Sequence, residues 1–446
     1  MTKSTATSLT PQKITDRIQS LDIMRGIVLC GILLMNINSM GMAGAYSDPT
    51  VSGGSTGWDL YTWITANMFF EGTMRALFSL LFGVGMFILL DRLEKKGAGI
   101  KSANIYFRRL LWLLFFGLVH GYLLLWTGEI LYQYALMGFL VYSFRNMAPK
   151  KLILIAVFLF SVGTLWNYMD YRKEMKFMAN VALVENFKKE GIPLTKELKE
   201  TEWKWDQKQY DRSAEGIAEY NQNMRKDYFQ VVAFLAPKNQ QYDQNWTYRY
   251  DLWDVLSMML LGIALFKLNI LSSEKSFKFY ASMASLGFLV GLTTNFFETS
   301  YILEQNFSSL SFAKTHITYD LGRVGVAFGH IGLIMILCKS PVLYWLKSAL
   351  SSVGKMALTN YVMHSVIAMF IFTGAGLGLF GAFLRHELLF IVFSIWIFQL
   401  ILSPIWLKYF YFGPLEWLWR NLSYQQKHPL IKTNPFKVNR LEPKAI

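Results

Sequence analysis

The amino-acid sequence predicts an all-α protein, a polytopic integral membrane bundle of about ten transmembrane helices. Hydrophobic residues make up 53% of the 446 residues, and the mean hydropathy is +0.28, which is too apolar for an ordinary soluble domain. Apolar stretches of about 20 residues, the length that crosses a bilayer, recur along the chain. The basic residues are also distributed as membrane topology requires. These three observations predict the fold class.

Ten segments have the length and composition of spanning helices. They are residues 21–42, 70–90, 107–126, 129–146, 151–169, 250–270, 277–297, 317–338, 356–374 and 388–409. These spans predict four regions along the chain. The regions are a membrane half at 1–169, an extracytoplasmic and mostly helical insertion at 170–249, a second membrane half at 250–412, and a cytoplasmic tail at 413–446.

Lys and Arg cluster after every second span, whereas residues 43–69 and 127–129 contain none. Because cationic loops remain on the cytoplasmic side, this alternation places both termini in the cytoplasm. It also accounts for the net charge of +14, so we expect the lipid bilayer, and no nucleic acid, as a partner. Cys30 and Cys338 have no metal-ligand spacing, and we expect no metal.

The first span places a polar side chain deep in the membrane. Arg17 and Arg25 mark its cytoplasmic end. Asn36 follows roughly 14 residues after the start of the span, about 20 Å deep at ~1.5 Å per residue. An amide at that depth either joins two helices by a hydrogen bond or lines a wet cavity, and both alternatives remain open.

Charged pairs fall near the outer ends of the second and eighth spans. Glu71 and Arg75 are four residues apart, and Asp320 and Arg323 are three apart. Each pair fits either an ion pair on one helical face or the wall of a polar cavity. His330 follows Arg323 by seven residues, nearly two turns, and therefore shares its helical face.

Further titratable groups lie in the third, fourth and ninth spans. His120 is about 12 residues into the third span, beyond the midplane, where it either bonds a carbonyl group across a helix contact or faces a cavity. Glu129 lies at the outer entrance to the fourth span. Asn360, Tyr361 and His364 lie within about one turn of each other in the ninth. We expect these groups to converge on a cavity in the outer half of the membrane.

A histidine beside a carboxylate in such a cavity is suited to general base catalysis, because its pKa lies near neutrality. It could deprotonate a hydroxyl or amine that attacks an acyl group, while an amide stabilises the oxyanion. The same residues would also serve a proton-coupled transporter or exporter of a small polar solute. A scaffold without chemistry, in which the polar residues only pair between helices, is a third alternative.

Several local motifs resemble those of the YeiB-like family of bacterial inner-membrane proteins, a domain of unknown function. The residues that carry the resemblance are Ser20-Leu21-Asp22 with Arg25-Gly26, Leu77–Gly83, Gly117–Gly121, Gly128–Leu131 with Tyr134–Leu136, Gly354–Tyr361 and Gly413–Trp417. They cover nearly the whole chain. The resemblance implies the bacterial inner (plasma) membrane as the location.

The first two spans are also distantly similar to membrane acyltransferases of the heparan glucosaminide acetyltransferase type. Asp22, Arg25 and Gly26 match the Asp-x-x-Arg-Gly opening of those enzymes, and Asn36 matches an Asn late in their first helix. Their catalytic His in the following outer loop has no counterpart, because residues 43–69 contain no His. His120 is the most plausible replacement.

We therefore predict a membrane acyltransferase-like protein that moves an acyl group from a cytosolic donor, acyl-CoA, to an extracytoplasmic small-molecule, glycan or lipid acceptor. The predicted catalytic residues are His120 as base, Glu129 or Glu71 as its orienting group and Asn36 at the oxyanion. Arg25 would bind the donor phosphates. The remaining predicted substrate-binding residues are Arg75, Arg323, His330, Tyr361 and His364. A homo-oligomer is left open.

Overall fold

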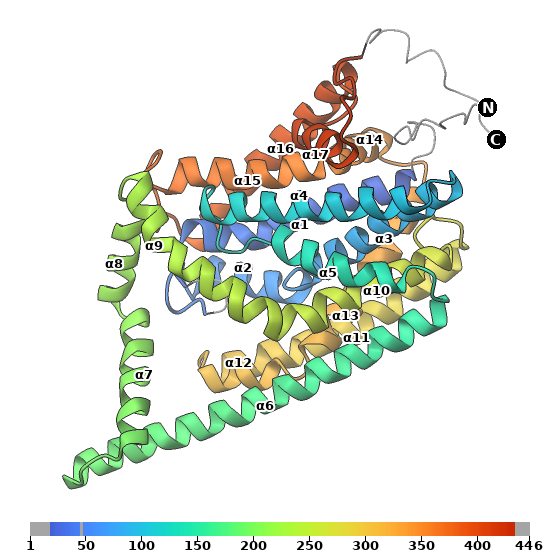
Figure 1. The fold of residues 1–446 in the computed structure, drawn as a ribbon. Coiled ribbons are helices and arrows are strands. Elements are labelled where there is room, and N and C mark those ends of the chain that lie inside the picture. The colour runs from blue at the N-terminus through green and yellow to red at the C-terminus, as the bar shows by residue number, and fades with distance from the viewer. Residues whose placement is uncertain (1–17, 45–47, 433–446) are drawn as a thin grey trace, which may run out of the picture.

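The computed structural model describes residues 18–44 and 48–432, which form a helical bundle with one long projecting arm (Figure 1). The helices of the first part are α1 (Gln19–Gly41), α2 (Gly57–Phe69), α3 (Thr73–Lys95), α4 (Ile100–Tyr122), α5 (Leu131–Phe144) and α6 (Pro149–Glu190). Those of the middle part are α7 (Lys196–Arg212), α8 (Ala214–Met224), α9 (Tyr228–Gln241) and the π-helix η2 (Tyr242–Asp251). The last part contains α10 (Leu252–Lys267), α11 (Phe277–Glu304), α12 (Ser309–Thr315), α13 (Tyr319–Lys339), α14 (Tyr344–Lys355), α15 (Ala357–Phe372), α16 (Arg385–Tyr409) and α17 (Pro414–Tyr424).

Each of the ten predicted spans coincides with a helix. By length and apolar composition, six helical segments in the described chain could cross a membrane, namely 19–41, 57–95, 100–122, 149–190, 319–339 and 385–409. The pair α14 and α15, bent by 82°, makes a seventh if it counts as one span. The helices α5, α10 and α15 have only 14, 16 and 16 residues. The structure supports a multi-pass helical membrane protein, while ten spans and the orientation of the termini stay predictions.

Glycines bring the central helices into close contact. A Cβ atom on Gly26 or Gly354 would lie 2.1 or 1.9 Å from a carbonyl oxygen of the opposite helix in the pair α1 and α14. In the pair α3 and α10, the corresponding distances at Gly83 and Gly262 are 2.5 and 2.3 Å. Such contacts exclude any side chain, so the helix backbones pack directly, as is usual between membrane helices.

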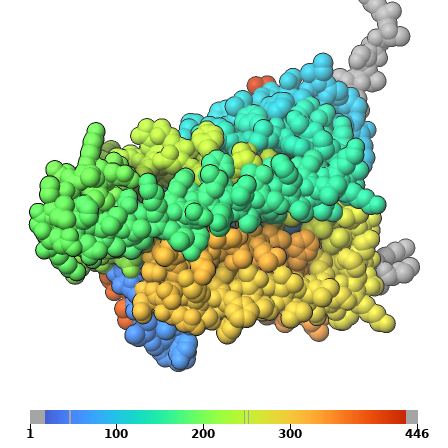
Figure 2. Space-filling view, turned by 90° about the horizontal axis from the view of Figure 1, so that it is seen from below, coloured from blue at the N-terminus to red at the C-terminus, as the bar shows by residue number. Residues whose placement is uncertain are grey.

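The projecting arm is built from α6 to α9. The sequence places the end of the fifth span at residue 169, but α6 continues without a break for 42 residues to Glu190, because the segment 170–190 contains no Gly or Pro. Gly191 then ends the helix with a φ of 69°. Helices α7 to α9 lead back to the bundle, where the Asn239 side chain donates to the carbonyl oxygen of Gly121 at 2.7 Å. In Figure 2, α6 forms a band beside the yellow and orange helices of the second membrane half.

Candidate functional site

A cavity of about 490 Å³ opens at one end of the bundle, between α1, α3, α4, α14, α15 and α17. Seven of its lining residues are Arg or Lys, and two, Asp22 and Glu416, are acidic. The basic residues are Arg25, Arg92, Lys95, Lys96, Arg109, Lys355 and Arg420. We call this end of the bundle the basic end. The charge balance makes the opening suited to a ligand with several negative charges.

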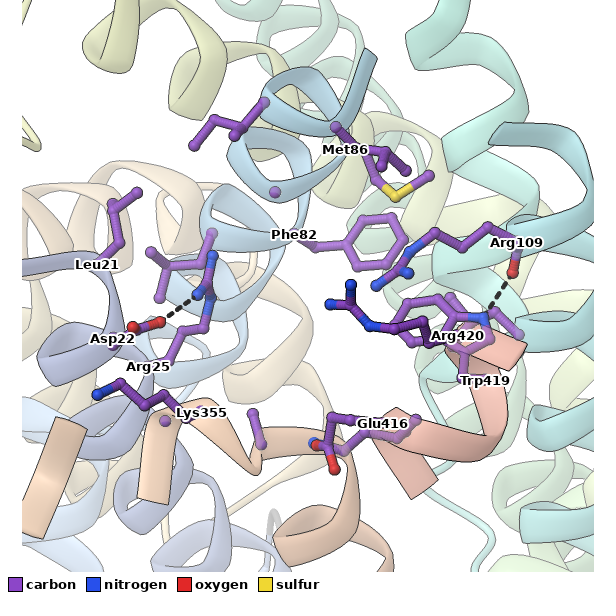
Figure 3. A pocket seen from close by; sticks show the side chains of 18 of the residues that line it. Leu21, Asp22, Arg25, Phe82, Met86, Arg109, Lys355, Glu416, Trp419 and Arg420 are labelled. Carbon is purple, nitrogen blue, oxygen red and sulfur yellow. Dashed lines mark hydrogen bonds and ion pairs between the residues drawn. The ribbon is translucent and has the colours of Figure 1, made fainter. Parts of the chain in front are cut away.

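The arginines face one another across the opening (Figure 3). On one side, Arg25 forms an ion pair with Asp22 at 2.8 Å. On the other side, Arg109 and Arg420 direct their guanidinium groups toward the space between. The Arg109 guanidinium lies 3.5 Å from the centre of the Trp419 ring, a cation–π contact. The Trp419 indole N–H also donates to the Arg109 carbonyl oxygen at 2.8 Å.

The C-terminal helix α17 forms one wall of the cavity. Its Glu416 carboxylate accepts hydrogen bonds from the backbone N–H groups of Leu358 and Thr359, at 2.7 and 3.1 Å, and from the Thr359 hydroxyl at 2.5 Å. These bonds cap the first turn of α15. Burial raises the pKa of the Glu416 carboxyl, and the hydrogen bonds from Thr359 and Leu358 act in the opposite direction. Glu416, Trp419, Arg420 and Tyr424 of α17, which lies within the segment predicted as a tail, therefore line the cavity.

The cavity becomes apolar with depth. Phe78 and Phe82 of α3 and Leu113 of α4 line its middle, and Tyr134 and Tyr361 lie among its lining residues on α5 and α15. Tyr361 is 1% exposed. The cavity thus combines a cationic opening with an apolar interior, a shape that fits a phosphorylated head group joined to an apolar arm.

Tyr361 connects this cavity to the predicted catalytic pair. Its ring contacts the His120 imidazole edge to face, with the ring centres 5.0 Å apart. His120 Nδ1 lies 3.4 Å from Glu129 Oε1, and His120 Nε2 lies 2.7 Å from Ser365 Oγ. The structure thus brings together His120, Glu129 and Tyr361, and it adds Ser365 of α15.

Local structure fixes the Glu129 carboxylate. It accepts hydrogen bonds from the backbone N–H groups of Leu131 and Tyr132, the second at 2.8 Å, at the beginning of α5. The positive end of the helix dipole favours a carboxylate at this position. A Cβ atom on Gly117 would lie 2.5 Å from the backbone nitrogen of Tyr132, so this glycine allows α4 to approach α5 closely.

Two hydrogen-bond donors lie beside the histidine. The Trp126 indole N–H lies within hydrogen-bonding reach of the Tyr361 hydroxyl, and neither group has another side-chain or backbone partner within the described chain. Both side chains are buried, with exposures of 5% and 1%. The Trp126 backbone nitrogen also donates to the His120 carbonyl oxygen at 3.4 Å. Buried donors without an ordinary partner are costly, which makes them candidates for a role with a ligand or intermediate.

The predicted charged pairs form a separate cluster. Asp254 of α10 pairs with Arg75 and with Arg323, each at 2.5 Å. Asp320 pairs with Arg323 at 2.7 Å, which is one of the two alternatives that the sequence left open. Glu71 does not share a helical face with Arg75. It lies in the turn between α2 and α3 and accepts a hydrogen bond from the Tyr319 hydroxyl at 3.1 Å. The helix α3 begins at Thr73, three residues later than the span that we predict.

The other predicted residues lie apart from both groups. Asn36 of α1 is half-buried and lines neither of the two described cavities. His330 Nδ1 bonds the Val326 carbonyl oxygen at 2.9 Å within its own helix. His364 Nε2 bonds the side-chain oxygen of Gln399 at 3.1 Å. The expected convergence of all these groups on one chamber is therefore wrong. The described residues contain no group of three or more His, Cys, Asp or Glu side chains placed to hold a metal ion.

Sequence reasoning missed the residues that complete the site from distant parts of the chain. They are Ser365, Asp254, Trp126, Arg109, Trp419 and Arg420. The motif Gly413–Trp417 indicates that a helix begins just before Trp419, because Pro414 and Glu416 are typical of a helix start. Ser365 carries no such signal, since serine is common in membrane helices.

The fold and the site define a multi-pass helical membrane protein with a basic, inwardly apolar cavity that leads to a buried histidine. The chain belongs to the YeiB-like family. It is 30% identical to the uncharacterized protein YeiB of Escherichia coli (strain K12) over 426 residues, covering 93% of this chain and 98% of the relative. A family model described as "Protein of unknown function (DUF418)" matches residues 265–426.

Two further relatives match over the same extent. The uncharacterized protein YxaH of Bacillus subtilis (strain 168) is 29% identical over 444 residues, covering 95% of this chain and 98% of the relative. An uncharacterized 39.9 kDa protein of Bacillus acidopullulyticus is 25% identical over 439 residues, covering 94% and 98%. No solved structure matches the chain.

Proposed function

We propose that this protein is a membrane acyltransferase that moves an acyl group from cytosolic acyl-CoA to an extracytoplasmic sugar, lipid or peptidoglycan-type acceptor. One observation carries the proposal: the cavity extends from a basic opening to Tyr361, and Tyr361 contacts the His120 imidazole. A site for acyl-CoA needs both features, because the donor has a polyanionic head and its thioester lies at the end of an apolar arm.

The opening fits the head of the donor. Phosphates prefer arginine, which offers several N–H donors in a fixed plane. Arg25 lies on one side and Arg109 and Arg420 on the other, so a nucleotide head between them would contact all three (Figure 3). The pantetheine arm and the acyl group then occupy the apolar part beside Phe78 and Phe82.

His120 is the proposed base and Glu129 its orienting group. His120 does not line the large cavity, so the thioester has to pass beside the Tyr361 side chain to reach it. The buried Tyr361 hydroxyl and the Trp126 indole N–H near it replace Asn36 as the proposed oxyanion donors, because the Tyr361 ring contacts His120 and Asn36 lines neither described cavity.

The topology of the proposal is ten spans with both termini in the cytoplasm and the protein in the bacterial inner membrane. The basic end then faces the cytoplasm, in agreement with the positive-inside rule. The donor enters from the cytosol. The arm α6–α9 lies on the extracytoplasmic side, where α9 contacts the end of α4 that carries His120.

CoA binding tests this proposal. We expect purified protein in detergent to bind CoA, and Arg420→Gln to weaken the Kd about tenfold, since one charge-assisted hydrogen bond contributes roughly 1.5–3 kcal/mol. Lys427→Gln is the matched control, because Lys427 is exposed on the same C-terminal segment and does not line the cavity. Absence of CoA binding to the wild-type protein would refute the proposal.

A second candidate function is transport of a small polar solute. The observation that favours it is the 82° bend between α14 and α15, since broken helices beside a cavity are common in transporters. Uptake or export of a labelled solute by proteoliposomes, driven by a proton gradient and with no CoA binding, would support this alternative.

A further inference from the structure

The geometry points to Ser365 as a nucleophile that carries the acyl group covalently, with His120 and Glu129 completing a Ser–His–Glu triad. This inference rests on the proposed function and names a catalytic residue and a reaction order for it. Ser365 Oγ lies 2.7 Å from His120 Nε2, and His120 Nδ1 lies 3.4 Å from the Glu129 carboxylate. A hydroxyl next to a base, with a third group orienting that base, is the arrangement that activates a serine.

All three side chains are removed from bulk water. Ser365, His120 and Glu129 are 2%, 1% and 4% exposed. The Glu129 carboxylate is fixed by the backbone N–H groups at the start of α5, so it holds the imidazole without moving. The distance of 3.4 Å between Nδ1 and Oε1 is longer than an ordinary hydrogen bond, which is common in sites without substrate.

A second, smaller cavity has Ser365 in its wall. It has a volume of about 30 Å³ and is lined by Ser365, Trp126, Ser39 and Met224, among other residues. This volume accommodates one water molecule or the hydroxyl group of an acceptor, but not CoA. Tyr361 lines the large cavity and Ser365 the small one, and the two residues are four apart on α15.

One cavity that ends at Tyr361 and another that reaches Ser365, four residues farther along α15, favour a reaction in two steps. In the first, Ser365 Oγ attacks the thioester carbonyl and its proton passes to His120 Nε2. The tetrahedral intermediate then collapses, the C–S bond breaks, and the CoA sulfur takes the proton. The products are an acyl ester on Ser365 and free CoA.

In the second step, the acceptor hydroxyl attacks the ester from the small cavity. His120 accepts the hydroxyl proton and returns it to Ser365 Oγ as the C–O bond to the serine breaks. The acyl group thus passes between the two sides of the bundle on an amino-acid side chain. Donor and acceptor never need to occupy the protein together.

Isotope exchange between acyl-CoA and free CoA tests the first step without any acceptor. We expect the wild-type protein to transfer the acyl group from acetyl-CoA to labelled CoA, because the acyl ester on Ser365 reacts with either molecule. Ser365→Ala should lower this exchange at least about 100-fold. Ser394→Ala is the matched control, since Ser394 lies exposed on α16 and bonds its own helix.

Mass spectrometry of the same samples locates the acyl group. The wild-type protein should gain one acetyl group on Ser365, and Ser365→Cys should gain it as a thioester that neutral hydroxylamine removes. This variant distinguishes a nucleophilic Ser365 from a hydroxyl that only orients His120. A cysteine at this position can still attack the acyl group, but the product is a thioester instead of an ester. The Ser365→Ala variant, shown to be folded and to bind CoA, is the negative control and should gain no acetyl group.

Three results would overturn the triad. They are exchange that survives in Ser365→Ala, an acetyl group on His120, and a wild-type protein that binds CoA but neither exchanges nor becomes acylated. In each of these cases CoA binding leaves the proposed function standing. A wild-type protein that binds no CoA rejects both, so the two failures are distinguishable.

Discussion

The buried ion cluster gives a stability prediction with a defined size. Asp254 is paired with Arg75 through Oδ2 and with Arg323 through Oδ1, each at 2.5 Å. Its side chain is 10% exposed, and that of Arg323 is 1% exposed. Asp254→Asn keeps the shape of the side chain but removes its charge, so two arginines lose one shared anion.

The expected loss of stability depends on the ion pairs that remain after the substitution. Removing one partner of a buried pair costs about 3–5 kcal/mol, because a charge is left uncompensated. Arg323 keeps Asp320 at 2.7 Å, and the Arg75 side chain is only partly buried, with 26% of its surface exposed. Both facts place the loss at the lower end, about 3 kcal/mol. Asp320→Asn should cost less, about 1.5 kcal/mol, because Arg323 keeps Asp254.

Reversible unfolding of the purified variants in mixed micelles measures these free energies. Asp91→Asn is the matched control, because Asp91 pairs with Lys95 on one helix and the two side chains are 34% and 74% exposed. The free energy of unfolding of Asp91→Asn should fall by less than about 0.5 kcal/mol. The reasoning fails if Asp254→Asn unfolds as easily as Asp91→Asn, since the cluster would then behave as a surface pair.

Three further predictions concern the site and its walls. Gly354→Ala should lower the free energy of unfolding by about 2 kcal/mol, because its Cβ would lie 1.9 Å from a carbonyl oxygen, whereas Gly85→Ala, with its nearest atom at 3.7 Å, should be close to neutral in the same assay. Glu416→Ala should destabilise the first turn of α15 by about 1 kcal/mol, seen as faster amide hydrogen exchange at Leu358 and Thr359, and unchanged exchange there would contradict the capping role. Tyr361→Phe should slow acyl transfer about 100-fold without weakening CoA binding, and an unchanged rate would remove the hydroxyl from the proposed oxyanion site.

Local sequence patterns predicted the positions of the helices well, but not which side chains of distant helices contact one another. Each expected span lies on a helix, because apolar length is a property of the segment itself. His120 and Glu129 also meet as predicted, since only nine residues and one short turn separate them. Partners that lie farther along the chain could not be found this way. Ser365 is 245 positions from His120, and its contact depends on how α15 packs against α4.

The position of a residue along a membrane helix does not determine the direction in which its side chain points. Asn36 lies on α1, but rotation about the helix axis decides which neighbours it meets, and that rotation is set by close packing at Gly26 against α14. Glu71 shows a second limit. Because α3 begins three residues later than we expected, Glu71 lies in a turn and not on a helical face, and its hydrogen-bond partner is Tyr319. Charge pairing is therefore predictable only where the helix register is known.

The bend between α14 and α15 distinguishes the two functional candidates by its surroundings. A carrier needs a hinge at such a break, whereas an enzyme needs the two helices held still. On one side, Gly354 packs so closely against the backbone of α1 that a methyl group would not fit. On the other side, Glu416 of α17 binds the first backbone N–H groups of α15. Because both flanks of the break are fixed, the bend serves to place Lys355 at the basic opening and Tyr361 in the interior, which favours a rigid donor site over an alternating gate.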